Sequence, residues 1–343
     1  MLGLILTCTV LISLGICLFA HRLGSALEVL DCPTIGGRKR HGRPTPLVGG
    51  FAVIVPVMLS LAVLSMAQPL FALMGLCVLA MLAMGMADDR SGLSATKRLL
   101  LAAAALLVLM VVVPDFRLTH LTFSFLDDPV ALGSGALMFS LLSVLGLQNA
   151  VNMADGKNGL VLGMGLIWTI MLGFYAPAPL HPVLSVMAVA LSITLVFNLR
   201  GKLFLGDAGS YSVSVLIGLL SVYTYNHANA GGSTVLYADM LALWFLVPVI
   251  DCLRLIGSRA LRRQMPFSAD RTHLHHYLHA FSSRWRNGLA FYLSLVAVPA
   301  AISAIYPPAT LLLAATMVAF YAVLYAYYAR RTAVCYALFA RSE

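Results

Sequence analysis

The sequence predicts an all-α, polytopic integral membrane protein, and three observations support that fold class. Of its 343 residues, 61% are hydrophobic and 10% are charged, and the mean hydropathy is +0.92. A soluble domain carries about 25% charged residues. Apolar runs of membrane-spanning length recur along the chain to residue 328, and basic residues gather on alternate connections between them. We therefore expect a single integral membrane domain over residues 1–343 with about eleven transmembrane helices.

The predicted spans are apolar stretches near the length of about 20 residues that crosses a bilayer as a helix. In chain order they cover residues 1–20, 47–66, 69–87, 99–113, 130–151, 159–175, 182–199, 210–226, 235–253, 289–305 and 309–328. The first has no basic residue before it and no small-residue cleavage site after it. We therefore expect it to remain as a span and not to be removed as a signal peptide.

The basic residues predict the orientation. When the connections are assigned alternately to two sides, all of the 22 Lys and Arg residues except Arg117 share one side. The positive-inside rule places that side in the cytoplasm and the N-terminus outside. Contact with inner-membrane lipids accounts for the net charge of +9, and no nucleic-acid partner is needed. The predicted cytoplasmic loops form the active face and cover residues 21–46, 88–98, 152–158, 200–209 and 254–288.

Two adjacent aspartates, Asp88 and Asp89, follow the third stretch. The C-terminal end of a helix disfavours an acidic group by about 0.3–1 kcal/mol, so the pair suggests a bound cation. Neighbours on a helix point about 100° apart, and we expect these two to serve different partners. A solvated helix end with Arg90 as counter-charge is the alternative. Lys97 follows at the start of the next span.

Polar residues also stripe the end of the fifth stretch. Asn149, Asn152 and Asp155 recur every third residue and share one helical face, and Asn158 follows. Hydrogen bonds between helices, or a ligand, would satisfy these side chains. Asp207 precedes the eighth stretch between two glycines, where an aspartate is either an N-cap or a Mg²⁺ ligand beside a phosphate site.

Histidines and arginines supply the opposite charge. Four of the nine histidines lie within residues 273–279, just after Arg271. We expect them to contact phosphates; a zinc site and an interfacial amphipathic helix are the alternatives. The first inner loop carries basic residues up to Arg43, ahead of Gly49-Gly50. That segment either anchors the chain to anionic lipid or forms a cationic rim where the glycines allow close backbone approach.

Carboxylates for Mg²⁺ and cations for phosphate oxygens together are the groups that phosphoryl transfer requires. The span centres carry almost no ionisable residues, which argues against proton-coupled transport. A carrier for a lipid-linked sugar or a neutral solute is the alternative from another class of function.

The order of these motifs resembles the polyprenyl-phosphate N-acetylhexosamine-1-phosphate transferases (glycosyltransferase family 4). The lead-in Pro266-Phe267-Ser268-x-Asp270-Arg271 is similar to the branch that uses UDP-N-acetylglucosamine. The motifs are Arg38–Gly50, Asp88-Asp89, Asn149-x-x-Asn152-x-x-Asp155-Gly156, Gly206-Asp207-x-Gly209-Ser210 and His273-x-His275-His276.

The resemblance implies that undecaprenyl phosphate attacks the β-phosphate of a UDP-N-acetylhexosamine, so that UMP leaves and a lipid-linked pyrophosphoryl sugar forms. It implies Mg²⁺ as cofactor, with Mn²⁺ as the alternative. It also implies a bacterial cytoplasmic (inner) membrane protein whose active site faces the cytoplasm. The product would be the first lipid-linked intermediate of a cell-envelope polysaccharide.

The resemblance further implies roles for individual residues. Asp207 would ligate Mg²⁺, Asp88 would be the base or orienter for the lipid phosphate, and Asp89 would assist at the metal or lipid site. The implied catalytic residues are Asp88, Asp89 and Asp155, and the implied metal ligands are Asp207, Asp88 and Asp89. The implied substrate-binding residues are Asn149, Asn152, Asp155, Asn158, Phe204 (as a uracil-stacking face), Lys97, Arg43, Arg271, His273, His275 and His276.

The sequence departs from the family pattern at Asn158, where an aspartate is usual. An amide supplies no negative charge, so a metal or base role is in doubt at that position. N-acetylglucosamine is the favoured sugar, with N-acetylgalactosamine or a 6-deoxy acetamido sugar as alternatives. The downstream polymer, O-antigen or another, is open at this point, and so is the oligomeric state, monomer or homodimer.

Overall fold

The computed structural model describes residues 2–32, 43–231, 235–261, 263, 273–281 and 284–339. The α-helices within these ranges are α1 Leu2–Leu18, α2 Ala20–Ala26, α3 Gly49–Ser65, α4 Leu70–Ser91, α5 Ala95–Val112, α6 Ala136–Ala154, α7 Leu160–Gly173, α8 His181–Leu199, α9 Gly206–Asn229, α10 Ala238–Trp244, α11 Leu246–Leu261, α12 Leu274–Phe281, α13 Trp285–Ile305 and α14 Thr310–Phe339. Short 3-10 turns cover Pro114–Phe116, Gly133–Gly135, Ala178–Leu180 and Pro307–Ala309.

The predicted fold class, an all-α polytopic membrane protein, is confirmed. In the described part of the chain, 7 helices are long and apolar enough to cross a membrane, or up to 9 if each of two bent pairs is one span. Two further apolar helices, α3 and α7, are shorter. Each predicted apolar stretch overlaps a helix, while the count of eleven spans and their orientation stay predictions.

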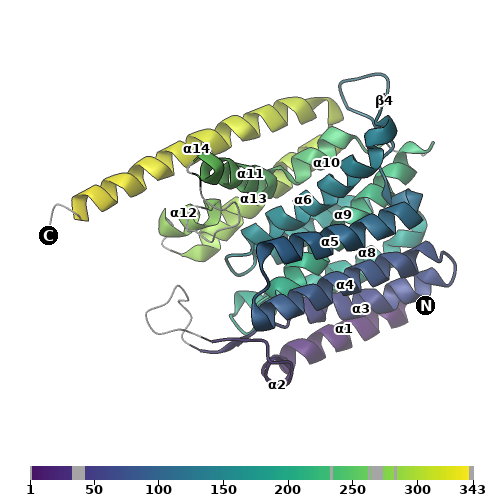
Figure 1. Ribbon diagram of the computed structural model, residues 1–343, viewed down its shortest axis with the longest axis horizontal. Coiled ribbons are helices and arrows are strands. Elements are labelled where there is room, and N and C mark those ends of the chain that lie inside the picture. The colour runs from purple at the N-terminus through teal and green to yellow at the C-terminus, as the bar shows by residue number, and fades with distance from the viewer. Residues whose placement is uncertain are drawn as a thin grey trace.

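The two sides inferred from the basic residues correspond to two ends of the molecule. The helices α2 and α12, from predicted inner connections, lie at one end of the bundle (Figure 1). The start of α1 and the strand β4, on the predicted outer side, lie at the other end (Figure 1).

The stretch 235–253 is not the continuous helix that the sequence predicts. It breaks between α10 and α11, whose axes differ by 72°. Pro248 lacks the N–H that would bond the carbonyl of Trp244 in a continuous helix. That carbonyl instead accepts a hydrogen bond from the Trp168 indole at 2.9 Å.

The described residues also contain two short antiparallel strand pairs, which were not predicted from the sequence. β1 (Leu30–Asp31) pairs with β2 (Thr45–Pro46), and β3 (His120–Leu121) pairs with β4 (Val130–Ala131). The register sets Leu30 opposite Pro46 and His120 opposite Ala131.

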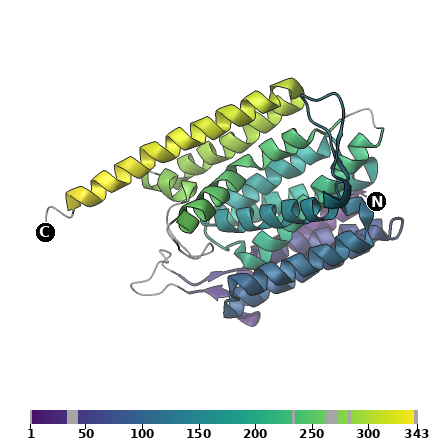
Figure 2. The same cartoon turned by 45° about the horizontal axis from the view of Figure 1, so that its top comes forward.

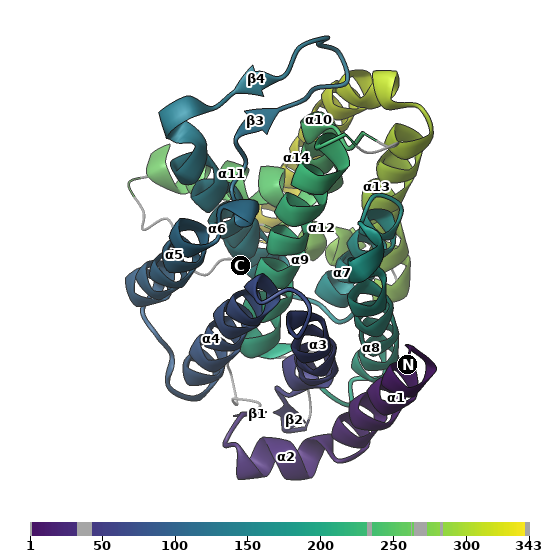
Figure 3. The same ribbon diagram turned by 90° about the vertical axis from the view of Figure 1, so that its right-hand side faces the viewer.

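Helix α9 is the centre of the bundle (Figure 3). It packs against α3, α4, α6 and α7, and every residue in its most apolar stretch is buried. Close approach depends on glycine, because a Cβ on Gly85 of α4 would lie 2.4 Å from the N and Cα atoms of Ala208. A Cβ on Gly50 of α3 would lie 2.5 Å from the N and Cα atoms of Gly209. Small residues therefore bring the first turn of α9 against α3 and α4.

The C-terminal helices form one edge of the molecule. α13 and α14 run side by side, and the end of α14 extends beyond the bundle (Figure 2). α12 packs against α13.

Candidate active site

Asp88, near the C-terminal end of α4, is buried and paired. Its Oδ2 accepts a hydrogen bond from Arg98 Nη1 at 2.7 Å, which is also an ion pair. Its Oδ1 accepts the backbone N–H of Leu93 at 2.6 Å. Tyr211, one turn into α9, donates its hydroxyl to Asp88 Oδ2 at 3.2 Å. Asp88 thus fixes the guanidinium of Arg98, which lies near the start of α5.

Asp89 points to a different partner, the N-terminus of α9. Its two carboxylate oxygens accept the backbone N–H groups of Asp207 and Ala208 at 2.9 and 3.0 Å. Gly206 has φ +76° and a Cβ there would lie 2.8 Å from Asp89 Oδ2, so glycine is required where α9 begins. The two adjacent aspartates therefore contact different partners, and their separate roles stay predictions.

This contact also corrects two expectations about the start of α9. Asp207 lies inside the first turn of the helix and is not its N-cap, which is Leu205. A phosphate site was also expected at this helix start, but the backbone N–H groups of Asp207 and Ala208 are already bonded to Asp89. Similarly, Gly49 and Gly50 donate their backbone N–H groups to the carbonyls of residues 204 and 205. The close backbone approach that these glycines allow is thus to the segment before α9.

The polar stripe on α6 meets α9 beside these aspartates. Asn152 Nδ2 donates to Asp207 Oδ1 at 2.7 Å and to Ser210 Oγ at 2.9 Å. Asp155 follows directly after α6 as its C-cap. Burial, together with the negative charges of Asp207 and Asp89, raises the pKa of Asp155 to about 8. Asp89, Asp155 and Asp207 therefore lie close enough together for their carboxylates to repel one another.

Helix α12 brings imidazoles to the same place. His275 is 2% exposed, and its Nε2 atom would be 2.2 Å from a Cβ on Gly156, so the ring lies against the backbone next to Asp155. The rings of His273, His275 and His276 form one cluster with centroid separations of 4.3–6.3 Å. Burial lowers the pKa of His275, and the neighbouring His276 and His273 lower it further.

The donor set is suited to Mg²⁺, which prefers one or two carboxylates and takes its remaining ligands from water and phosphate oxygens. Asp207 and Asp155 supply carboxylates whose mutual repulsion a cation would relieve. Within the ranges that the structure describes, no group of three His, Cys, Asp or Glu side chains could hold an ion by itself. Water and substrate phosphates are the ligands that Mg²⁺ usually takes in addition to one or two carboxylates.

The remaining predicted site residues lie in varied surroundings. Asn149 Nδ2 donates to the carbonyl of Leu145 in its own helix, and the carbonyl of Asn158 accepts from the Trp285 indole. Phe204 is partly buried in the connection before α9. Lys97 and Arg43 are exposed, and Arg271 lies outside the described residues.

Three residues in these networks were not predicted as site residues. Arg98 follows Lys97 and is the basic residue that pairs with Asp88. Tyr211 stands four positions after Asp207 on the same helical face, a spacing that could have revealed it. Asp251 bonds His273 from within a predicted span, where a carboxylate is itself a signal of function.

Comparison with known proteins places these residues in a family context. Residues 71–225 match the sequence model of glycosyl transferase family 4. The chain is 27% identical over 278 residues to an undecaprenyl-phosphate alpha-N-acetylglucosaminyl 1-phosphate transferase of Yersinia pestis, covering 78% of this chain and 74% of that protein. Proteins of the same name are 27% identical in Escherichia coli strain K12, covering 76% and 71%, and in Salmonella typhi, covering 75% and 71%. The resemblance drawn from the motifs is confirmed.

Proposed function

We propose that this chain, whose residues 71–225 match the sequence model of glycosyl transferase family 4, transfers N-acetylhexosamine-1-phosphate from a UDP-sugar to undecaprenyl phosphate. An oxygen of the lipid phosphate forms a bond to the β-phosphorus, and the bond from that phosphorus to the oxygen bridging to UMP breaks. UMP leaves with that oxygen. The favoured donor is UDP-N-acetylglucosamine, the sugar in the names of the relatives.

The observation that carries this proposal is the convergence of four chain segments at one end of the bundle. Asp88 and Asp89 come from α4, Asn152 and Asp155 from the end of α6, and Asp207 from the start of α9. The α12 imidazoles close the group against residue 156. Carboxylates that would hold Mg²⁺, with imidazoles beside them, suit a reaction between two phosphorylated substrates, because the cation would offset the repulsion between the two phosphates.

Each part of the site has a proposed task. Asp88 holds the guanidinium of Arg98, which would bind the phosphate of the lipid acceptor. Asn152 orients the carboxylate of Asp207, and Asp207 and Asp155 would hold Mg²⁺ with the donor's pyrophosphate. When bound, Mg²⁺ would neutralise charge that develops on the phosphate oxygens. The imidazoles of α12 would donate hydrogen bonds to the pyrophosphate or the sugar.

The location follows from the chemistry of the substrates. The acceptor is anchored in the bilayer while the donor is soluble and anionic, so the site has to lie at a membrane surface. We place it at the cytoplasmic face of the bacterial inner membrane, because the basic connections share that side. A homodimer is compatible with this arrangement.

The experiment measures UMP released by the purified protein. We expect UMP only when a UDP-sugar, undecaprenyl phosphate and Mg²⁺ are all present. Asp88→Asn and Asp207→Asn should each abolish turnover in folded protein, whereas Asp127→Asn, an exposed aspartate at the other end, should not. Full activity in both site variants would refute the proposal. Substrate flux into proteoliposomes without UMP would instead identify a carrier.

The sugar is decided by a separate measurement. UDP-N-acetylglucosamine, UDP-N-acetylgalactosamine and a UDP-linked 6-deoxy acetamido sugar are offered in turn, and the lipid product is weighed by mass spectrometry. We expect N-acetylglucosamine to be preferred. A preference for another sugar would correct the donor and leave the reaction class standing.

A further inference from the structure

Asp251 of α11 is a buried carboxylate that contacts His273 and the first residue of α12. It is 4% exposed and lies outside the residues that match the family. Its Oδ2 lies 3.0 Å from His273 Nδ1, and its Oδ1 accepts the backbone N–H of Leu274 at 3.2 Å. One side chain thus holds both the first imidazole of the cluster and the first residue of α12.

The carboxylate is itself held by two further groups. Arg254, one turn along α11, donates Nη2 to Asp251 Oδ1 at 2.9 Å. Tyr321 of α14 donates its hydroxyl to the same oxygen, and Arg254 Nε donates to the Tyr321 oxygen at 2.8 Å. The C-terminal helix therefore takes part in the network, although it contributes no residue to the cluster of carboxylates.

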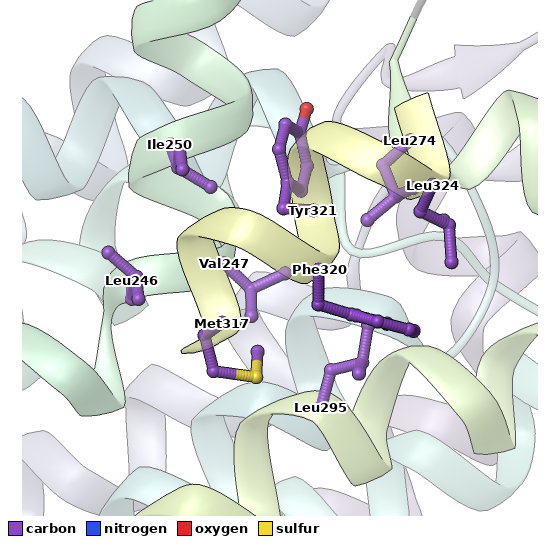
Figure 4. Close-up of a pocket in the computed structure, with 9 residues that line it drawn as sticks. All are labelled: Leu246, Val247, Ile250, Leu274, Leu295, Met317, Phe320, Tyr321 and Leu324. Carbon is purple, nitrogen blue, oxygen red and sulfur yellow. The ribbon is translucent and has the colours of Figure 1, made fainter. Parts of the chain in front are cut away.

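Apolar packing keeps the Tyr321 ring in place. The ring lines a small apolar pocket between α11, α12, α13 and α14, and its oxygen lies at the end away from Met317 and Leu295 (Figure 4). Leu274 lines the same pocket. Leu274 thus fixes the start of α12 in two ways. Its side chain packs in the pocket, and its backbone N–H donates to Asp251.

We propose that Asp251 and Tyr321 are positioning residues for the donor substrate, acting through His273 and the start of α12. An Nδ1–H bonded to the carboxylate leaves Nε2 of His273 as the nitrogen that can face a ligand. The same anchor sets where His275 lies against residue 156. For histidines that bind a metal, removing such an orienting partner typically costs about 10–100-fold in affinity or activity, and we take that range as the guide for His273. This inference rests on the proposed function.

The experiment separates KM for each substrate from kcat in steady-state UMP release. Asp251→Asn should raise KM for UDP-N-acetylglucosamine by about tenfold or more and leave KM for undecaprenyl phosphate unchanged. Tyr321→Phe, which removes one hydroxyl, should raise the same KM by a smaller factor. Tyr325→Phe is the matched control: it lies one turn further along α14, and its ring, 4.2 Å from the Arg254 guanidinium, is retained. We expect wild-type constants for it.

A double-variant cycle tests whether the effect passes through the histidine. In a His273→Ala background, Asp251→Asn should raise KM for the donor by no more than about twofold, because the imidazole that the carboxylate orients is absent and the asparagine oxygen can still accept the Leu274 N–H. A merely structural role would lower the active fraction, and hence kcat, with both KM values unchanged; that result would overturn the inference. If Asp251→Asn does not fold, Tyr321→Phe alone tests the inference. An unchanged KM for the donor in that variant overturns the inference. Wild-type protein that releases no UMP would refute the proposed function itself.

Discussion

Replacing Gly85 by alanine tests whether the contact between α4 and α9 sets the geometry of the site. The added Cβ would lie 2.4 Å from Ala208 N and Cα and from Asp207 O, all backbone atoms that cannot rotate away. Ordinary contact needs a separation larger by roughly 1 Å, so the two helices have to move apart by about that distance. Overpacking of this kind typically costs about 1–3 kcal/mol. A displacement of about 1 Å at a reacting centre can lower the rate about 100-fold.

Gly75→Ala is the matched control, because Gly75 is also buried on α4 and its Cβ would meet only Met58 Sδ at 3.8 Å. Alanine in place of a helical glycine should be neutral or stabilising there by up to about 1 kcal/mol. The assay pairs UMP release with thermal unfolding in detergent followed by tryptophan fluorescence. We expect Gly85→Ala to unfold at a lower temperature and to lose most activity, and Gly75→Ala to lose neither. Wild-type activity and stability in Gly85→Ala would refute the reasoning.

The remaining predictions concern charge and metal. Asp89→Asn should lower the unfolding temperature, because one amide oxygen cannot replace two carboxylate oxygens that accept N–H groups at the start of α9. The lost hydrogen bond costs about 1–3 kcal/mol. An unchanged unfolding temperature would contradict the role of Asp89 in holding the start of α9. Arg98→Gln should raise KM for undecaprenyl phosphate and not for the UDP-sugar; the reverse pattern would remove Arg98 from the acceptor side. Burial lowers the pKa of His275 below the usual 6.5, so the imidazole takes up a proton more readily in the unfolded chain than in the folded one. The free energy of unfolding therefore has its full value above about pH 6.5 and falls as the pH drops. Unfolding temperatures between pH 8 and pH 5 should therefore decline more in wild type than in His275→Gln, and equal slopes contradict this. EDTA should abolish UMP release and Mg²⁺ restore it; activity that persists in EDTA argues against the metal.

Much of the fold could be predicted because a bilayer imposes length and hydropathy on each segment separately. Every predicted apolar stretch overlaps a helix, and the connections assigned to the two sides lie at opposite ends. The helix break at residue 245 was missed, although Pro248 offered a signal. Whether the proline breaks the helix depends on a partner for the carbonyl of Trp244, and Trp168 of another helix supplies that hydrogen bond. The two strand pairs were missed for a different reason, since each strand is only two residues long and shows no alternating pattern that would reveal it.

For the candidate site, the sequence by itself determined which side chains are present and that acids, amides and imidazoles occur in connections on one side. Their types and spacing are local properties, and they were enough to indicate phosphoryl transfer and the family. Only the tertiary structure decided the partners: Asp88 with Arg98, Asp89 with the start of α9, and His273 with Asp251. Those contacts depend on how closely α4 approaches α9 and where α12 meets α11. Packing of distant segments sets such distances, and no stretch of sequence contains them.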